Sequence, residues 1–289
     1  MQIKKTRIAI TIDGGGIRGV FPLMLLNHIN CLLLKQGFNK KVSDLVDFVS
    51  GTSAGAIISA GMVIRKNGMQ LFSIDDLLDL YVSRGPQLFN LTNPGKAQSE
   101  GLRLLLKRKL KDIYLSDLTS EFALVSFDIK TNTPFIFEKS NTNLLLTELS
   151  TVLAACSAIP GYFAPVNFKD HILIDGIAAA KNPSMIGWEY IQKLFPDDEI
   201  LFLSLGTGEL TGEYFDTMEE EVNHVHQSML TVADKNPKLH YYRLQPTICF
   251  ADPRMDNASP ENIHALMQDA TTFIEKEQDT FQKIIELML

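Results

Sequence analysis

The chain has 289 residues, of which 45% are hydrophobic, and its 27 Lys and Arg against 34 Asp and Glu give a formal net charge of −7. This acidic balance argues against binding of a nucleic-acid polymer through broad electrostatic attraction. The length and apolar content suffice for one large core, and no linker, low-complexity tract or repeat marks an internal boundary. A single domain over 1–289 is therefore predicted.

Cysteine content and the N-terminal sequence narrow the class of protein further. Cys31, Cys156 and Cys249 are an odd number without metal-ligand spacing, so neither a disulfide framework nor a metal site is expected, and we expect all three thiols in the core. The first residues lack the apolar segment of a signal peptide, and no stretch is predicted to reach the ~18 apolar residues of a membrane span. A cytoplasmic protein is expected, with any membrane contact peripheral.

Strands and helices alternate along the chain. Residues 7–12 predict a buried strand, and 20–35 predict a helix after a glycine-rich turn. A second strand, turn and helix are predicted over 45–49, 50–55 and 56–66. Two such units imply a largely parallel sheet. Further strands are predicted over 123–128, 135–138, 172–174, 200–205 and 242–244, and further helices over 74–83, 102–110, 145–155, 185–194 and 261–288.

A glycine-rich loop follows the first predicted strand, in the segment Asp13-Gly14-Gly15-Gly16-Ile17-Arg18-Gly19. Consecutive glycines expose backbone N–H groups that suit a phosphate or an oxyanion. Gly14, Gly16 and Gly19 also fit the dinucleotide-binding pattern G-x-G-x-x-G, which expects an acidic residue ~20 positions further on. No acid follows the predicted helix until Asp44, so nucleotide binding is the weaker interpretation.

The segment Gly51-Thr52-Ser53-Ala54-Gly55 is a G-x-S-x-G motif between a predicted strand and a predicted helix. A serine on so sharp a turn is held in a strained backbone conformation, and it needs Gly51 and Gly55 beside it because larger side chains would collide with the strand and the helix. Its hydroxyl projects beyond the sheet, near the first N–H groups of the helix. This context favours a nucleophile over a chance pentapeptide.

A third glycine-marked turn, Ile174-Asp175-Gly176, closes a predicted strand. An aspartate at the C-terminal end of a strand in an α/β sheet points into the crevice where such proteins bind ligands. Alone, the pair is more typical of an ordinary Asp-Gly turn. Its occurrence with the other two motifs favours a role for the carboxylate.

Together the three motifs resemble those of the patatin-like phospholipases. That family has D-G-G-G-x-R-G as an oxyanion loop, G-x-S-x-G around its nucleophile, and D-G-G or D-G-A as the source of a catalytic carboxylate. The resemblance covers about 7–244 and continues in the family's order through the segments 158–165, 182–183, 203–208 and 241–243. One departure is Ile177, which stands where the family usually has Gly or Ala.

The resemblance implies a three-layer α/β/α fold with a largely parallel central sheet. It also implies roles for single residues: Ser53 as nucleophile, Asp175 as its base beside Gly176, Gly51 and Gly55 flanking the nucleophile, and Gly14, Gly15, Gly16 and Arg18 around the oxyanion. From sequence alone a surface position explains Arg18 equally well.

The implied function is hydrolysis of lipid acyl esters through an acyl-enzyme, without metal or cofactor. Phospholipids or lysophospholipids are the substrates that the resemblance implies, and it leaves open a regulated, membrane-acting effector with a small-molecule activator. The alternative is a catalytically silent lipid- or nucleotide-binding module that uses the glycine loop.

Histidine, the usual base of serine hydrolases, has no predicted role here. His171 is four residues from Asp175, a separation of about 13 Å along a strand, and it is predicted to lie in a loop. His224 and His226, on a predicted helical stretch, point away from each other and lack further metal ligands.

The segment 102–113 carries apolar residues on one helical face, namely Leu102, Leu106, Leu110 and Ile113, and basic residues elsewhere. Such a helix is typical of peripheral contact with anionic lipid, and equally of a helix packed on a sheet with a solvated basic side. The tail over about 260–289 is predicted to be a helical extension that packs on the core or mediates self-association.

Overall fold

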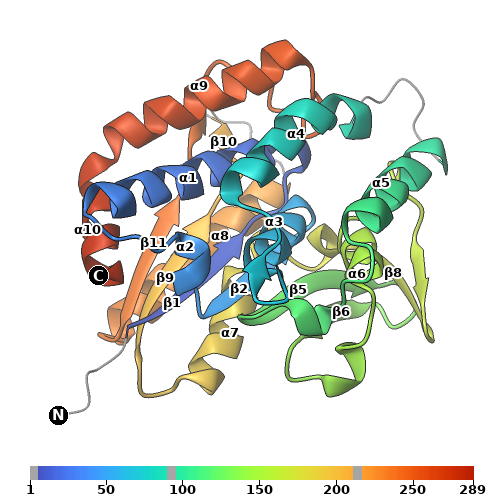
Figure 1. Ribbon diagram of the computed structural model, residues 1–289, viewed down its shortest axis with the longest axis horizontal. Coiled ribbons are helices and arrows are strands. Elements are labelled where there is room, and N and C mark those ends of the chain that lie inside the picture. The colour runs from blue at the N-terminus through green and yellow to red at the C-terminus, as the bar shows by residue number, and fades with distance from the viewer. Residues whose placement is uncertain (1–5, 90–95, 211–216) are drawn as a thin grey trace.

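The computed structural model describes residues 6–89, 96–210 and 217–289. Its centre is an eight-stranded sheet with the order β11-β9-β1-β2-β5-β8-β7, in which β6 also pairs with β5 (Figure 1). The strands that pair in parallel are β1 (Thr6–Ile12), β2 (Phe48–Thr52), β5 (Glu121–Asp128), β9 (Glu199–Leu205) and β11 (Leu239–Leu244). An antiparallel edge is added by β6 (Thr133–Glu138), β7 (Val166–Phe168) and β8 (His171–Asp175). The largely parallel sheet is confirmed.

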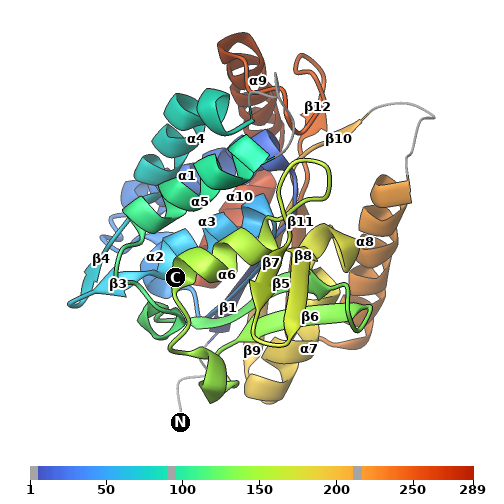
Figure 2. The same ribbon diagram turned by 90° about the vertical axis from the view of Figure 1, so that its right-hand side faces the viewer.

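Helices cover both faces of this sheet and complete three layers (Figures 1 and 2). One face is covered by α7 (Ser184–Leu194) and α8 (Thr217–Lys235). The other face is covered by α1 (Val20–Lys35), α3 (Ala54–Val63), α6 (Leu149–Cys156) and α10 (Gln278–Met288). Outside these lie α4 (Ile74–Phe89), α5 (Lys96–Lys109) and α9 (Pro260–Lys276). The short elements are α2 (Val42–Leu45), β3 (Arg65–Lys66), β4 (Met69–Gln70), β10 (Glu209–Leu210) and β12 (Thr247–Ile248).

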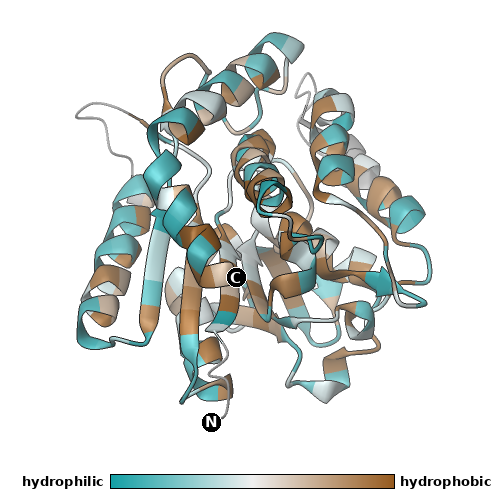
Figure 3. Cartoon of the chain, turned by 60° about the vertical axis from the view of Figure 1, so that its left-hand side comes forward, coloured by the Kyte–Doolittle hydropathy of each residue, from teal (hydrophilic) through white to brown (hydrophobic). Residues whose placement is uncertain are grey.

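The apolar pattern of the central strands explains why both faces are covered. In β1, Ile8, Ile10 and Ile12 belong to the larger apolar cluster, whereas Ala9 belongs to the cluster beneath α7 and α8. Successive side chains of a strand point to opposite faces, so a strand that is apolar throughout must be buried on both. Figure 3 shows the same contrast, with brown central elements and mixed teal and brown outer helices.

The second strand lies further along the chain than predicted. Residues 42–45 form the short helix α2, and β2 runs over Phe48–Thr52 instead of 45–49. Its register with β1, from Ala9 opposite Phe48 to Ile12 opposite Gly51, fixes this position. Because β2 ends at Thr52 and α3 begins at Ala54, the predicted six-residue turn is reduced to Ser53 alone.

The helical run Gly16–Lys35 has the length and hydropathy of a membrane span, contrary to the expectation from sequence. Its Phe21, Leu25 and Ile29 have no exposed surface and pack in the main core. It contacts α4 and α9. In this structure it is therefore a helix of the main core, with 61% of its most apolar window buried.

Packing decides the expectations for the C-terminal extension and for the three cysteines. The C-terminal extension packs on the domain as two helices, α9 and α10, which meet at Glu277 instead of forming one helix. Of the cysteines only Cys156 is buried. Cys31 lies on the outward side of α1, and Cys249 follows β12, so the expectation that all three lie in the core was wrong.

The apolar face of the segment 102–113 packs inside the protein. Leu102, Leu106, Leu110 and Ile113 are each at most 7% exposed and belong to the main core. A membrane contact through this face is ruled out in this structure, because the residues that would enter the lipid are already covered. The basic side chains of the same segment remain exposed.

Candidate active site

Ser53 occupies the single residue between β2 and α3, with φ 54° and ψ −123°. A positive φ is costly for a residue with a side chain and is typical of strained functional turns. A Cβ atom at Gly51 would lie 2.3 Å from the carbonyl oxygen of Gly55, and one at Gly55 would lie 2.2 Å from that of Ile12. Both flanking glycines are therefore required by close backbone contacts, and together they hold Ser53 at the rim of the sheet.

Asp175 is the last residue of β8, and it lies at the same rim of the sheet as Ser53. β8 runs antiparallel to β5, with Asp175 opposite Ser126. In β2 the last residue, Thr52, lies opposite Val125 of β5. The two strand ends therefore meet across β5. β8 starts beyond the rim and runs back to it, so Asp175 comes to the rim on one of the antiparallel strands of the largely parallel sheet (Figure 2).

The carboxyl group of Asp175 has no exposed surface. Its Oδ1 accepts a hydrogen bond of 2.8 Å from the N–H of Ile177, so the departure from the family pattern at Ile177 leaves this support in place. Oδ2 is also buried and makes no hydrogen bond with the described residues. Burial raises the pKa of Asp175 to about 7, although the nearby Ser53 hydroxyl and the Ile177 N–H lower it in part. A carboxylate with this pKa beside a serine is suited to act as a base near neutral pH.

The ester hydrolysis that the sequence motifs imply is expected to depend on pH through Asp175. The base acts only when ionised, so kcat/KM should rise with pH through about 7 and then level off. Well below this value it should fall about tenfold per pH unit. A pH profile on a non-ionising ester from pH 5 to 9 checks this, with samples returned to pH 8 to show that the enzyme survives. A midpoint near pH 4 would instead indicate an ordinary, solvated carboxyl.

The glycine loop follows β1, and its first glycine is held from both sides. The N–H of Gly14 donates to the carbonyl oxygen of Lys181 at 3.0 Å, and its own carbonyl accepts from Thr207 Oγ1 at 2.8 Å. Gly14 therefore anchors the loop and does not offer its N–H to a substrate, contrary to the implied role. Gly15 and Gly16 line the cavity beside Ser53, and within the described residues their N–H groups donate no hydrogen bond.

Two contacts explain why glycine stands at both remaining positions. A Cβ atom at Gly15 would lie 2.5 Å from Thr207. Gly16 has φ +55°, and a Cβ atom there would lie 2.3 Å from the carbonyl oxygen of Met255. That carbonyl accepts the N–H of Ile17 at 2.9 Å. The loop thus presents two backbone donors from a conformation that its surroundings fix.

Arg18 lies in the turn Gly16–Gly19 and lines the same cavity. It is only 3% exposed, so the alternative of an ordinary surface arginine was wrong. The dinucleotide interpretation also weakens, because the next strand, β2, ends at Thr52 and is followed by Ser53, where that fold expects a ribose-binding acid.

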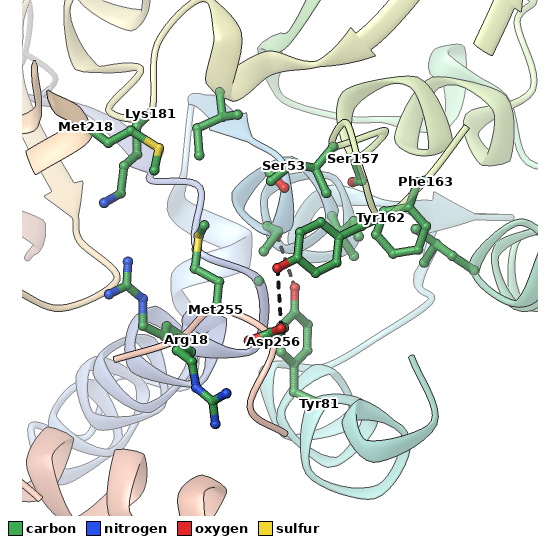
Figure 4. A pocket seen from close by; sticks show the side chains of 18 of the residues that line it. Arg18, Ser53, Tyr81, Ser157, Tyr162, Phe163, Lys181, Met218, Met255 and Asp256 are labelled. Carbon is green, nitrogen blue, oxygen red and sulfur yellow. Dashed lines mark hydrogen bonds between the residues drawn. The ribbon is translucent and has the colours of Figure 1, made fainter. Parts of the chain in front are cut away.

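A cavity of about 420 Å³ adjoins Ser53 (Figure 4). Its volume lies within the usual range of ligand pockets. One side is apolar and is built from α3, α4, α5 and the loop after α6: Ile57, Leu80, Tyr81, Leu102, Leu105, Leu106, Ile159, Tyr162 and Phe163. Figure 4 shows Arg18 and Lys181 away from Phe163, beside Met218 and Met255. Glu219 and Arg254 also line the cavity. Such a cavity accepts a ligand with an apolar chain and a polar end.

One wall of the cavity lies outside the part of the chain that the motifs cover. Residues 253–256, between β12 and α9, line it, and Tyr162, from the loop after α6, donates a hydrogen bond of 3.3 Å to Asp256 Oδ2. Asp252 and Asn262 hold this segment through several short hydrogen bonds. No motif in the sequence marks it, because its place depends on how α9 packs.

The histidines lie elsewhere. His171 is the first residue of β8 rather than a loop residue, and its Nδ1 lies 2.7 Å from Oδ2 of the buried Asp128. His226 Nδ1 lies 3.1 Å from the hydroxyl of Tyr241. Within the described residues no histidine makes a hydrogen bond to Ser53 or Asp175, and no group of three metal-ligating side chains occurs.

Comparisons with known proteins agree with the motifs. The sequence profile described as patatin-like phospholipase matches residues 10–188, more than half of the chain. The chain belongs to the patatin-like phospholipase family. It is thereby assigned to a family of lipid acyl hydrolases.

Individual relatives are distant. A patatin of Solanum tuberosum is 27% identical over 323 residues, which cover 92% of this chain and 83% of the patatin. A second protein of that organism, named "Probable inactive patatin-3-Kuras 1", is 30% identical over 231 residues, covering 69% of this chain and 62% of its own length. Among solved structures, VipD from Legionella pneumophila aligns with a TM-score of 0.39 and 13% identity over 94% of this chain and 71% of VipD.

Proposed function

We propose that this family member hydrolyses lipid acyl esters with Ser53 as nucleophile and Asp175 as its base. The observation that supports the proposal most is the meeting of a strained serine and a buried carboxyl of raised pKa at one rim of the sheet. The free N–H groups of Gly15 and Gly16 border the same cavity. A nucleophile, a base and oxyanion donors are the parts that acyl transfer requires.

The proposed reaction has two steps. Ser53 Oγ bonds to the ester carbonyl carbon as Asp175 takes its proton, and the oxyanion is held by the N–H groups of Gly15 and Gly16. The bond to the leaving alkoxide then breaks, and Asp175 returns the proton to that oxygen. In the second step a water gives a proton to Asp175 and attacks the acyl-enzyme. Collapse releases the fatty acid and restores the proton to Ser53 Oγ.

The cavity supports a substrate with a long acyl chain. The chain lies along the apolar side formed by α3, α4 and α5, and the polar part of the lipid lies toward Arg18 and Lys181. Phospholipids and lysophospholipids fit this division. A panel of phospholipids, lysophospholipids and neutral glycerides, with product analysis by mass spectrometry, should show release of fatty acid from the first two classes.

The alternative is a silent lipid-binding module, and the name of one relative says "Probable inactive" of that protein. The two functions differ in a simple readout. An active enzyme releases fatty acid and reacts with a fluorophosphonate at Ser53, whereas a silent module binds lipid and does neither.

We propose that any membrane contact uses the basic side of α5. On α5, Arg103, Lys107 and Arg108 are exposed, and Leu104 among them is 66% exposed, while Leu102, Leu105 and Leu106 of the same helix line the cavity. Lys111, in the turn after α5, is exposed as well. Replacing Lys107 and Arg108 with Glu should at least halve binding to vesicles containing anionic phosphatidylglycerol, because surface cations each add about 1 kcal/mol of attraction. Co-sedimentation measures this. Lys35→Glu with Lys40→Glu serves as the control, because both lysines are exposed, Lys35 as the last residue of α1 and Lys40 in the loop after it. Equal binding by both double variants would contradict the proposal.

A further inference from the structure

Arg243, on β11, lies three strands away from β2 and Ser53. In the sheet it stands opposite Ser204 of β9, which stands opposite Thr11 of β1. Its Nη1 donates to Asp13 Oδ1 at 3.0 Å and to Ser204 Oγ at 2.8 Å, and its Nη2 donates to Asp13 Oδ2. Asp13 is the first residue of the glycine loop. The guanidinium thus donates hydrogen bonds to both carboxylate oxygens of Asp13, the residue with which that loop begins.

Both charges of this pair are buried, with the side chain of Arg243 6% exposed and that of Asp13 1% exposed. A buried charge needs its partner, and removal of one member leaves the other uncompensated. The two parallel hydrogen bonds also fix the plane of the carboxylate, which a single bond would not do. The direction in which the chain leaves Asp13 is therefore set by Arg243.

The same pair joins a buried network beneath the loop. Ser204 Oγ lies 2.7 Å from Ser184 Oγ, which donates to Asn182 Oδ1 at 2.6 Å. Asn182 follows Lys181, whose carbonyl oxygen accepts the N–H of Gly14. Arg243 is therefore linked to the glycine loop by two routes. One is its direct hydrogen bonds to Asp13, and the other runs through the side chains of Ser204, Ser184 and Asn182 to the segment whose Lys181 carbonyl holds Gly14.

We propose that Arg243 is a positioning residue for this reaction, which holds the Gly15 and Gly16 donors, through Asp13, where the oxyanion forms. The inference rests on the proposed function. Oxyanion donors stabilise the transition state only when they are fixed in place beforehand, and a small displacement costs much of their effect. Arg243 is not among the residues that line the cavity, so its effect is indirect.

The test compares Arg243→Gln and Arg243→Lys with a matched control, Arg7→Gln. Arg7 lies at the opposite end of β1 and also pairs with two chain-distant groups, Asp47 at 3.0 Å and Asp198 at 2.6 Å. On a soluble fatty-acid ester, kcat of the Gln variant should fall about 10- to 100-fold with KM within about twofold, as when oxyanion donors are misplaced. The Lys variant keeps the charge but loses the paired bonds, so an intermediate loss of kcat is expected. Arg7→Gln should keep kcat within about twofold.

Two further readouts separate positioning from general damage. The pH midpoint of kcat/KM should stay near that of the wild type in both Arg243 variants, because Asp175 is untouched. Thermal unfolding of all variants should show that they are folded at the assay temperature. Unchanged kcat, a loss confined to KM, a loss equal to that of Arg7→Gln, or failure of both Arg243 variants to fold overturns the inference. If the wild type itself releases no fatty acid, the proposed function fails instead.

Discussion

Replacement of Ser53 by alanine is expected to lower kcat for ester hydrolysis by at least about 10³-fold, because loss of a nucleophile removes the covalent route altogether. Alanine meets the same strain as serine at φ 54°, so thermal stability should be close to that of the wild type. Fatty-acid release from the preferred lipid, measured beside thermal unfolding, checks both parts.

Ser157 offers the matched control for this variant. It also lines the cavity, is 5% exposed, and has a hydroxyl that makes no hydrogen bond with the described residues (Figure 4). Ser157→Ala should therefore keep kcat within a few-fold of the wild type. Equal losses in the two variants, or full activity of Ser53→Ala, would contradict the assignment of the nucleophile.

Replacement of Asp175 by asparagine should remove activity and raise stability at the same time. Hydrolysis should fall about 10³- to 10⁴-fold, because the amide cannot accept the proton of Ser53. The folded pKa of Asp175 is raised from 3.8 to about 7, so the folded state binds an extra proton between these values and loses stability as pH rises through them. At about 1.4 kcal/mol per pKa unit, the upper limit of this loss is about 4 kcal/mol.

Asparagine is neutral and keeps an oxygen for the N–H of Ile177, so it avoids that loss. The free energy of unfolding of Asp175→Asn should exceed that of the wild type by most at pH 8, and the difference should vanish near pH 4. Urea unfolding at both pH values measures it. Asp128→Asn is the control, for which the opposite change in stability is expected. Burial raises the pKa of Asp128, but hydrogen bonds from His171, two backbone N–H groups and Thr131 outweigh this and lower it well below the ordinary value. Asp128→Asn should therefore destabilise the fold. The account fails if Asp175→Asn destabilises it as well.

The parts of the site that the sequence predicted are local in the chain. Gly51, Ser53 and Gly55 belong to one turn. The contact that requires glycine at position 51 is with Gly55 of that turn, whereas the one at position 55 is with Ile12 of the neighbouring strand β1. The glycine loop was predicted because it, too, is a local pattern in the chain. The hydrogen bond that the Gly14 N–H donates within the protein was not predicted. Its acceptor, Lys181, lies far along the chain, and no local pattern shows that contact.

The parts that were missed depend on residues distant in the chain. The sequence predicted that Asp175 ends a strand and faces the crevice. It did not predict the antiparallel direction of that strand, because the direction follows from the pairing of β8 with β5. Asp13 and Arg243 are 230 residues apart, and the sequence around neither residue predicts their ion pair. The segment 102–113 has the same amphipathic pattern whether it packs on protein or on lipid, and only the burial of Leu102 and Leu106 decides between the two.

The most direct test of the central claim is to map the residue that a fluorophosphonate modifies in the intact protein, by mass spectrometry of its peptides. The account predicts one adduct per chain, on Ser53, formed by the wild type and Ser157→Ala, slowed in Asp175→Asn and absent in Ser53→Ala. An adduct on another residue, or lipid hydrolysis that continues after Ser53 is fully modified, would contradict it.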